Sequence, residues 1–400
     1  MRKTFPKIAV LYPISVPWMA RCLNGIRRYA SEKGGWHLFC SPPTLHGAEE
    51  SALTLKSMQG WKGDGIIIAS TDADELREAR SFEIPVVNLA AGLSPSHGIP
   101  RVMVDHFKAG EMAAEHLIEH GLRHLAFYGW EDMWYSTRRQ EGFTRRAREA
   151  GISPVVLLQK ARVKSSFSWQ ERIANLSEWL KALPRPTGIF AVHDYRAQLV
   201  MEACDEVGLR IPDDVSVIGM DDDETICEHC VPTLTSVSRN SEEVGRRAAE
   251  LMDRLMQGEV SSREDILVPP DRITVRQSTD KLYSEDSIAQ AALDYIRVNL
   301  RRQFSVEELA ADLGISKRTL ENRLRQHLRS SPRELVVKLR VQHAQHFLRN
   351  APKCTLEQVA IECGFGTSRS FFKCFRFMTG MSPGHFRKGI REFPEESNWI

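Results

Sequence analysis

The sequence predicts an α/β region of about 280 residues, followed by an all-α region of about 120 residues that carries two helix-turn-helix motifs. Three observations predict this division. Strand-like apolar runs alternate with amphipathic segments over the first 280 residues. One helix-turn-helix pattern occurs twice between residues 305 and 379, and positive charge is concentrated in the last third of the chain. We therefore expect two domains, residues 1–280 and 281–400.

The first region is expected to form parallel sheets. We predict strands at residues 8–12, 65–69, 85–89, 102–104, 125–128, 188–192 and 215–220, and helices at residues 19–31, 109–120, 139–150, 169–183 and 197–207. Continuous apolar strands between helices are typical of a parallel sheet that is covered on both faces. These units are too many for one sheet, so two sheets are expected. Ligands of such sheets bind beyond the carboxyl ends of the strands.

Side chains suited to a sugar follow several of these strands. Asp194 and Asp221 each come directly after a predicted strand, and Arg139 follows the strand around residue 127. Trp18 and Trp134 lie in nearby loops. Charged planar groups hold neighbouring hydroxyls in pairs, and an aromatic ring covers the C–H face of a sugar. We predict that these five residues bind the ligand, although Asp194 could equally be a helix N-cap and Trp134 a packing residue.

No catalytic or cofactor motif accompanies these residues. The first 280 residues have no Gly-x-Ser-x-Gly elbow, no phosphate-binding glycine loop and no His-Glu-x-x-His pattern. The acid–imidazole pairs at residues 105–106 and 193–194 are chain neighbours, and neighbours on a strand point to opposite faces. The acidic run 221–224 lacks the glycine of a calcium loop. Residues 227–230 (Cys-Glu-His-Cys) could be half of a zinc site or a redox pair, but incidental cysteines are favoured. We therefore expect that the chain is not an enzyme and that it binds no metal ion and no cofactor.

The two helix-turn-helix motifs span about residues 305–328 and 355–379. Their apolar patterns match at an offset of 50, which becomes 51 past the turn. Gly314 and Gly364 permit the sharp turns between the helices. The second helix of such a motif has an exposed face that fits the major groove of DNA. One match would be weak evidence, but two in phase predict a DNA-binding domain.

The outward faces of the two second helices are the candidate DNA contacts. Leu320 and Leu324 are expected to point inward in the first helix, and Phe371 and Phe375 in the second. The outward residues that we predict to contact DNA are Lys317, Arg318, Glu321 and Asn322, then Ser368, Arg369, Ser370 and Lys373. Residues 333–350 are expected to form a helix that separates the two motifs.

The charge distribution supports a nucleic-acid partner for the second region only. Residues 281–400 hold 20 Lys and Arg against 13 Asp and Glu, whereas the first 280 hold 34 against 39. Such asymmetry favours binding of double-stranded DNA by the C-terminal part. No apolar run has the length of a membrane span, no signal-peptide pattern is present, and the eight cysteines have no framework spacing. We therefore expect a cytoplasmic protein with no membrane partner.

Two resemblances refine these expectations. The last hundred residues, including Gly380-Met381-Ser382-Pro383-Gly384-His385-Phe386-Arg387, resemble the AraC/XylS family of transcription regulators. The first 280 resemble the sugar-binding domains of LacI/GalR regulators and periplasmic sugar-binding proteins, on Arg139-x-x-Gly142-Phe143, His193-Asp194-x-x-Ala197 and residues 215–222. The resemblance implies an α/β two-lobe periplasmic-binding-protein-like (type I) domain. Its N-lobe would be about residues 1–104 and 239–275, and its C-lobe about residues 105–238, with crossings near residues 104–105, 236–239 and 274.

The resemblance also implies a function. The chain would be a sugar-responsive, sequence-specific regulator, an activator of pentose (xylose-like) catabolism genes. Xylose or a related monosaccharide would bind between the lobes and alter the arrangement of the DNA-binding domains in a homodimer, with a DNA operator and RNA polymerase as partners. Three alternatives remain open: a repressor with the same parts, a sugar-modifying enzyme fused to a DNA-binding tail, and a first region that mainly dimerises.

Overall fold

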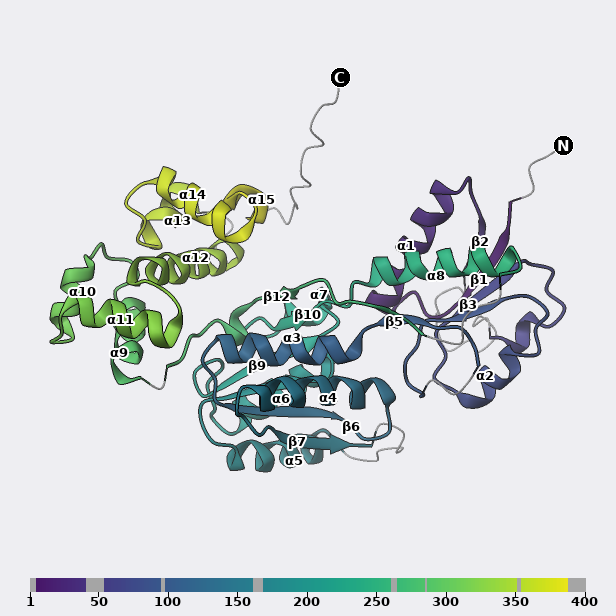
Figure 1. Cartoon of the computed structure of the whole chain (residues 1–400), viewed down its shortest axis with the longest axis horizontal. Coiled ribbons are helices and arrows are strands. Elements are labelled where there is room, and N and C mark those ends of the chain that lie inside the picture. The colour runs from purple at the N-terminus through teal and green to yellow at the C-terminus, as the bar shows by residue number, and fades with distance from the viewer. Residues whose placement is uncertain are drawn as a thin grey trace, which may run out of the picture. The chain divides into compact units, whose positions relative to one another are not determined.

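The computed structural model describes residues 5–40, 54–94, 98–160, 168–259, 265–284, 286–350 and 354–387. The chain divides into two compact units, Met1–Thr279 and Asp280–Ile400. The first is mixed α/β and the second is all-α, as Figure 1 shows element by element. The predicted fold class is confirmed. We describe each unit by itself.

The first unit begins with a four-stranded parallel sheet. Its strands are β1 (Lys7–Leu11), β2 (His37–Cys40), β3 (Gly65–Ile68) and β4 (Val86–Asn88), in the order β2-β1-β3-β4. One face packs against α1 (Pro17–Glu32) and α8 (Ser241–Met256). The other packs against α2 (Ala73–Ala79) and the 3-10 turn Lys56–Met58. Because both faces are covered, the central strands are apolar along nearly their whole length.

A six-stranded sheet forms the other half of the unit. Its order is β12-β10-β9-β8-β6-β7, and only β12 is antiparallel to its neighbour. The strands are β6 (His124–Trp130), β7 (Val155–Gln159), β8 (Thr187–Ala191), β9 (Val215–Met220), β10 (Thr235–Val237) and β12 (Ile273–Thr274). The helices around this sheet are α3 (His106–Glu119), α4 (Trp134–Glu149), α5 (Trp169–Ala182), α6 (Asp194–Glu206) and the short α7 (Glu224–Cys227).

The chain passes between the two sheets three times. It crosses after β5 (Val102–Val104), after β10, and between β11 (Ile266–Val268) and β12. Strands β5 and β11 pair with each other in parallel. The third crossing comes before Ile273, because Ile273 and Thr274 pair with Val237 and Ser236 of the six-stranded sheet. The sequence analysis had assigned residues up to 275 to the N-lobe, so its boundary lies past this crossing.

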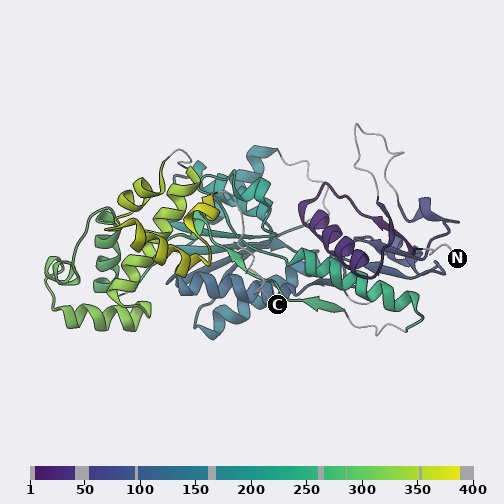
Figure 2. The ribbon, with the colours of Figure 1, turned by 90° about the horizontal axis from the view of Figure 1, so that it is seen from above.

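Paired glycines let two pairs of helices come into backbone contact. A Cβ at Gly25 of α1 would lie 1.9 Å from the carbonyl oxygen of Glu242 in α8, and a Cβ at Gly245 would lie 1.9 Å from that of Cys22. Gly110 of α3 and Gly142 of α4 have the same relation to the backbone of the facing helix, at 2.0 and 1.9 Å. Helices α1 and α8, far apart in sequence, accordingly run side by side in Figures 1 and 2.

The second unit contains two helix-turn-helix motifs. Its helices are α9 (Ser287–Val298), α10 (Val306–Asp312), α11 (Lys317–Leu328), α12 (Pro332–Asn350), α13 (Leu356–Glu362), α14 (Ser368–Thr379) and α15 (Pro383–Arg387). Gly314 and Gly364 stand at the two turns with φ of +66° and +74°. Both turns therefore use the left-handed conformation that glycine adopts without steric cost.

Each motif has its own apolar core, and α12 contributes to both. The first core includes Leu309, Leu320 and Leu324 with the N-terminal part of α12 and with α9. The second includes Val359, Phe371 and Phe375 with the C-terminal part of α12. Helix α9, for which the sequence analysis predicted no element, completes the first core.

Candidate functional site

A pocket of about 170 Å³ opens between the two halves of the first unit. One wall comes from residues that follow β3 and β4, such as Ala69 and Ala90, and from the start of α1. The other wall is polar, and its side chains come from the α3 and α4 helices, from the ends of β8 and β9, and from the segment after β10. The pocket thus lies at the carboxyl ends of strands, where ligands of such sheets bind. Its volume is below the roughly 300–1,000 Å³ of sites for drug-sized molecules, so it suits a small ligand.

Arg139 of α4 is the central polar residue, and its side chain is 1% exposed. Its Nε donates to Nδ1 of His106 at 3.2 Å, and its Nη1 donates to the carbonyl of Val192. Its Nη2 lies 3.7 Å from Oδ1 of Asp221 and has no hydrogen-bond partner among the described residues. Burial lowers the pKa of Arg139 to about 10, so the guanidinium stays charged at neutral pH. One of its donor atoms is therefore available to a ligand.

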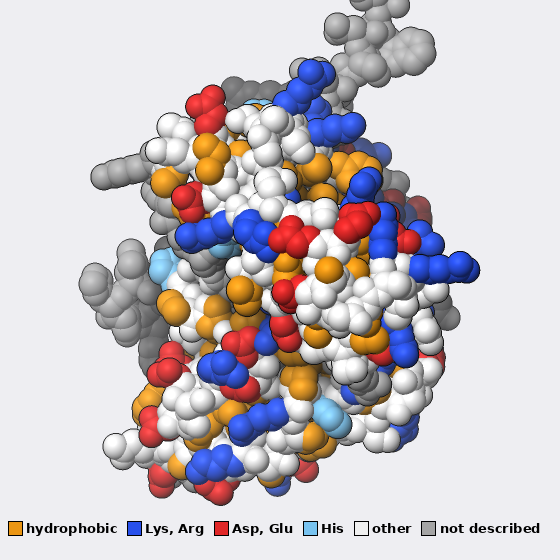
Figure 3. All heavy atoms as spheres, turned by 90° about the vertical axis from the view of Figure 1, so that its left-hand side faces the viewer, with side chains coloured by type: hydrophobic (Ala, Val, Ile, Leu, Met, Phe, Trp, Pro, Cys, Tyr) orange, Lys and Arg blue, Asp and Glu red, His pale blue; other side chains and the backbone are white. Residues whose placement is uncertain are grey.

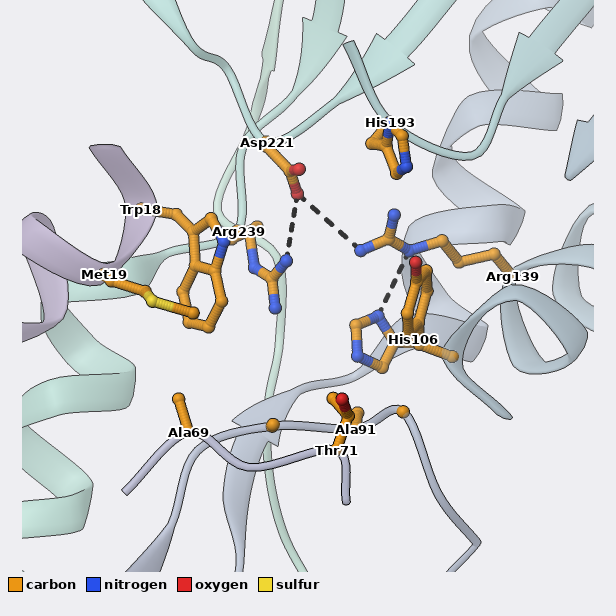
Figure 4. Close-up of a pocket in the computed structure, with 13 residues that line it drawn as sticks. Trp18, Met19, Ala69, Thr71, Ala91, His106, Arg139, His193, Asp221 and Arg239 are labelled. Atoms are coloured by element: carbon orange, nitrogen blue, oxygen red, sulfur yellow. Dashed lines mark hydrogen bonds and ion pairs between the residues drawn. The ribbon is translucent and has the colours of Figure 1, made fainter. Parts of the chain in front are cut away.

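Asp221 lies between two guanidinium groups, as Figure 4 shows. Its Oδ1 is 3.1 Å from Nη1 of Arg239 on the side opposite Arg139. The Cζ of Arg239 lies 4.0 Å from the ring centroid of Trp18. Asp221 has a φ of +115°, a backbone conformation that is strained for a residue with a side chain. Its carbonyl oxygen accepts from Nη2 of Arg21 at 2.5 Å, which ties the end of β9 to α1.

Two buried histidines complete the polar wall. Burial, followed by the charge of Arg139, lowers the pKa of His106 well below its usual value. Burial lowers the pKa of His193 to about 4. Nε2 of His193 accepts a hydrogen bond from the indole N–H of Trp130 at 3.2 Å. Both rings are therefore neutral at physiological pH and can act as hydrogen-bond donors or acceptors but not as cations.

The two second helices of the C-terminal motifs present exposed polar faces. Leu320, Leu324, Phe371 and Phe375 are fully buried, as the apolar spacing predicted. Of the predicted contact residues, six are exposed and two, Glu321 and Ser368, are intermediate; the six are Lys317, Arg318, Asn322, Arg369, Ser370 and Lys373. Nζ of Lys317 is held by Oε1 of Glu307 at 2.7 Å. In the face shown by Figure 3, Lys and Arg side chains are interspersed with acidic ones.

Comparison with known proteins matches both units to known domains and the whole chain to known regulators. Residues 114–279 match the periplasmic binding protein-like domain, and residues 309–389 match a helix-turn-helix domain. Over 394 residues the chain is 26% identical to the xylose operon regulatory protein of Haemophilus influenzae, covering 97% of this chain and 99% of that protein. The structure of a xylose-binding transcription activator aligns with a TM-score of 0.66 at 24% identity, over 98% of this chain and all of that one.

The chain is a transcription regulator similar to xylose operon regulatory proteins over nearly its whole length. The first unit has a further solved neighbour, a periplasmic binding protein/LacI transcriptional regulator from Alkaliphilus metalliredigens in complex with D-xylulofuranose. That structure has a TM-score of 0.54 and 26% identity over 68% of this chain and 98% of its own. Both family domains predicted from the sequence are thus confirmed: the periplasmic-binding-protein-like domain and the DNA-binding domain.

The pocket contains three of the five predicted ligand residues. Trp18, Arg139 and Asp221 line it. Asp194 does not: its buried carboxylate accepts from the Ser236 hydroxyl at 2.5 Å and from the N–H of Asp223 at 2.8 Å. Burial, together with the charge of Asp221, raises the pKa of Asp194 above its usual value. The residues after β9 surround its carboxylate, so Asp194 is not among the residues that line this pocket.

Trp134 also lies outside the pocket lining and joins the two lobes instead. Its backbone N–H donates to the carbonyl of Gly92 at 3.0 Å, and the guanidinium of Arg101 lies 5.2 Å from its ring centroid. The N–H of the next residue, Tyr135, donates to the carbonyl of Ala91 at 3.0 Å. The first turn of α4 therefore connects the lobe of the six-stranded sheet to the loop after β4.

The sequence analysis did not predict His106, His193 and Arg239, which also line the pocket. Both histidines had been noted only as members of acid–imidazole pairs and set aside when no catalytic motif was found. Arg239 had been placed at an expected crossing between lobes. The available signal was their position, since each follows directly on a predicted strand or crossing.

The structure also bears on membranes and metals. Among the described residues, no helix is both long and apolar enough to span a bilayer. Within that same part of the chain, no group of three or more His, Cys, Asp or Glu side chains is arranged to hold a metal ion. Cys227 and Cys230 are buried, and burial raises the pKa of Cys230 to about 11, which makes its thiol a poor nucleophile.

Proposed function

We propose that this regulator binds a monosaccharide in the pocket between its lobes and transmits the binding to its two DNA-reading helices. The observation that carries the proposal is the pocket itself. Its polar wall combines Arg139, Asp221 and Arg239, and its volume of about 170 Å³ suits a ligand of sugar size. Because relatives are named for xylose operons and a neighbour holds D-xylulofuranose, a pentose or a close derivative is the expected effector.

Sugar binding is expected to act by stabilising the closed arrangement of the lobes. Residues from both lobes line the pocket, so a ligand there contacts both at once. A ligand can shift such an equilibrium only by binding one state more tightly than the other. We propose that the closed state alters the spacing of the DNA-binding domains in a homodimer, in the cytoplasm, and thereby favours recruitment of RNA polymerase as an activator.

We propose that the two helix-turn-helix motifs read successive major-groove segments on one side of the duplex. Such segments lie about 34 Å apart, one helical turn. Helix α12 lies between the motifs and contributes to both cores, so it can hold α11 and α14 at a fixed separation. The basic residues of these two helices are the proposed contacts with the operator.

The deciding experiment compares Asp221→Ala with Asp205→Ala in the full chain. Asp221 lines the pocket, whereas Asp205 is an exposed carboxylate on α6 of the same lobe. Thermal unfolding with a panel of pentoses and hexoses comes first, because a ligand at about 100 times its dissociation constant adds roughly 2.7 kcal/mol of stability. We expect Asp221→Ala to bind DNA but to lose the sugar response, and Asp205→Ala to keep both. A normal sugar response of Asp221→Ala would show that the effector binds outside this pocket. Turnover of the sugar would favour the alternative that the first unit is an enzyme.

A further inference from the structure

Phe372 is an exposed aromatic side chain on the second DNA-reading helix. It is the fifth residue of α14 and is 38% exposed, whereas its chain neighbour Phe371 is fully buried. Single apolar side chains on a protein surface are common, so exposure by itself assigns no role. What distinguishes Phe372 is its position in the motif and the side chains around it.

The two motifs place Phe372 at the position that Glu321 occupies in α11. Past the turn the motifs correspond at an offset of 51 residues, and this offset pairs the buried Leu320 with the buried Phe371. The next residue of each helix is therefore at an equivalent position, Glu321 in the first and Phe372 in the second. Because Glu321 is among the expected base contacts of α11, Phe372 occupies a base-contact position of α14. The sequence analysis had named only polar residues there.

A carboxylate and an aromatic ring recognise different bases in the major groove. A carboxylate such as that of Glu321 accepts a hydrogen bond from the N4 amino group of cytosine. An apolar side chain instead contacts the C5 methyl group of thymine, which the other three bases lack. The ring of Phe372 has no hydrogen-bonding atom, so the feature of a base edge that it can recognise is this methyl group.

Two cations accompany Phe372 on the surface of α14. Arg369 lies three residues before Phe372 and four before Lys373, and residues at these spacings are neighbours on a helix surface. Both cations are exposed, and neither forms an ion pair with another residue in the part of the chain that the structure describes. Their charges are therefore available to DNA, and contacts with phosphates or guanines would hold the ring against the base edges.

The ring of Phe372 is held in place by the core of the second motif. Its centroid lies 5.7 Å from that of Phe371, and the two planes meet at 77° in an edge-to-face pair. Phe371 in turn packs against Phe365 and Phe375, with centroids at 5.2 and 5.5 Å. Because one edge of Phe372 rests on a buried ring, it loses less side-chain freedom on contact with a base than a mobile surface residue would.

We propose that Phe372 determines specificity for thymine, by packing its ring on the C5 methyl group of a thymine in the groove segment that α14 reads. This inference rests on the proposed function, in which α14 is one of the two DNA-reading helices. Phe372 lies in the N-terminal half of α14, and the N-terminal residues of a recognition helix contact the base edges. Burial of one methyl group strengthens binding about fourfold.

The test measures how DNA binding depends on single thymine methyl groups. The full chain first selects its preferred duplex from a random pool. Each thymine of that duplex is then replaced by deoxyuridine, which pairs as thymine does but lacks the methyl group. We expect the wild-type affinity to fall about fourfold at one or two thymines within the segment that α14 reads. In Phe372→Ala the same replacements should leave affinity unchanged.

Two further variants make the comparison specific. Phe377→Ala removes an aromatic ring that is 86% exposed in the last turn of α14, and it should keep the full dependence on the methyl group. Phe372→Glu gives the second helix the residue of the first, and it should favour cytosine over thymine at the same position. Thymine and deoxyuridine are compared within one protein, so a general change in stability does not imitate the effect.

The outcomes separate this inference from the proposed function. Selective binding without dependence on any thymine methyl group would overturn the inference and leave the proposed function standing. Wild-type methyl dependence in Phe372→Ala or in Phe372→Glu would do the same. Failure of the full chain to select any preferred duplex would count against both the inference and the proposed reading of DNA by the two motifs.

Discussion

The Ser236 hydroxyl donates a hydrogen bond to Oδ1 of Asp194, with 2.5 Å between the two oxygens. The other carboxylate oxygen of Asp194 accepts from the N–H of Asp223 at 2.8 Å. These contacts join the first residue of α6 to β10 and to the segment that carries Asp221. A Cβ at Gly219 would lie only 2.2 Å from Oδ1 of Asp194, so the carboxylate packs tightly against β9. Asp194 therefore holds the segment that carries Asp221 in place through these two hydrogen bonds.

Asp194→Ala is expected to weaken effector binding about tenfold or more. It leaves the Ser236 hydroxyl and the Asp223 N–H without their acceptor, which costs about 1–3 kcal/mol of folding stability for each buried group. The freed segment no longer holds Asp221 in place, and a loss of about 1.4 kcal/mol in binding free energy is tenfold in affinity. Asp194→Asn keeps an acceptor oxygen and should lose less. Calorimetric titration with the effector, together with the melting temperature, measures both variants. Wild-type affinity in a folded Asp194→Ala protein would show that this support is unnecessary.

Gly142→Ala is expected to destabilise the first unit by about 1–3 kcal/mol, the usual cost of overpacking. The added methyl would lie 1.9 Å from the carbonyl oxygen of Phe107, so α3 and α4 must separate. Seven of the eight tryptophans lie in the first 280 residues, so tryptophan fluorescence during urea unfolding reports on this unit. Thr137→Ala, at an exposed position of α4, is the control and should change stability by less than about 0.5 kcal/mol. Equal midpoints for both variants would contradict the packing argument.

Arg340→Met is expected to loosen the connection between the two DNA-reading motifs. Arg340 of α12 donates from Nε to the carbonyl of Leu300 at 3.2 Å and from Nη2 to the carbonyl of Arg302 at 2.7 Å. A Cβ at Gly364, in the second turn, would lie 2.9 Å from its Nε. Hydrogen exchange should therefore quicken at the end of α9 and around the second turn. Arg333→Met, exposed on the same helix, should leave exchange there unchanged.

Arg369→Ala is expected to lose preference at particular base pairs, about 1–3 kcal/mol at each position it reads. Arg369 is exposed near the start of α14, where a recognition helix meets the base edges. Binding to a library of operator variants at one salt concentration measures the effect. Arg376→Ala, near the end of the same helix, is the comparison and should weaken all sequences alike. A uniform loss of affinity across all operator variants in Arg369→Ala would instead show that Arg369 contacts a phosphate.

His193→Gln is expected to flatten the acid dependence of stability. Burial lowers the pKa of His193 to about 4, whereas the unfolded chain takes up this proton near pH 6.5. Its contribution to stability is therefore largest above pH 6.5 and falls between about pH 6.5 and 4, by up to ~1.4 kcal/mol per pH unit. The raised pKa of Asp194 acts in the opposite direction, since the folded state keeps that proton as the pH rises.

Melting temperatures between pH 4.5 and 7 test this expectation. Trp130→Phe is the control, because it removes the hydrogen bond to His193 but keeps the ionisable ring. The control should lower stability at every pH and retain the slope. An unchanged slope of melting temperature against pH in His193→Gln would show that other groups cause the acid dependence of stability. Buried His106 is the next candidate.

Local sequence was enough for many of the elements, although not for α8 or α9, and for the class of protein. The apolar runs around Ile8 and Val217 predicted buried parallel strands, and the spacing of Leu320 with Leu324 and of Phe371 with Phe375 predicted the inward faces of the recognition helices. These features depend on periodicity, which neighbouring residues specify by themselves. Residue types after the strands also located Arg139 and Asp221.

Long-range packing determined which side chains line the pocket and how its charged groups pair. Asp194 and Asp221 look alike in sequence, since each follows a strand, yet Ser236 and Asp223 enclose one and the pocket exposes the other. Arg239 is 100 residues from Arg139 and joins it only because the chain crosses back between the lobes after β10. Burial and pairing depend on such distant segments, so the position of Asp221 between two guanidiniums could not be inferred from local pattern.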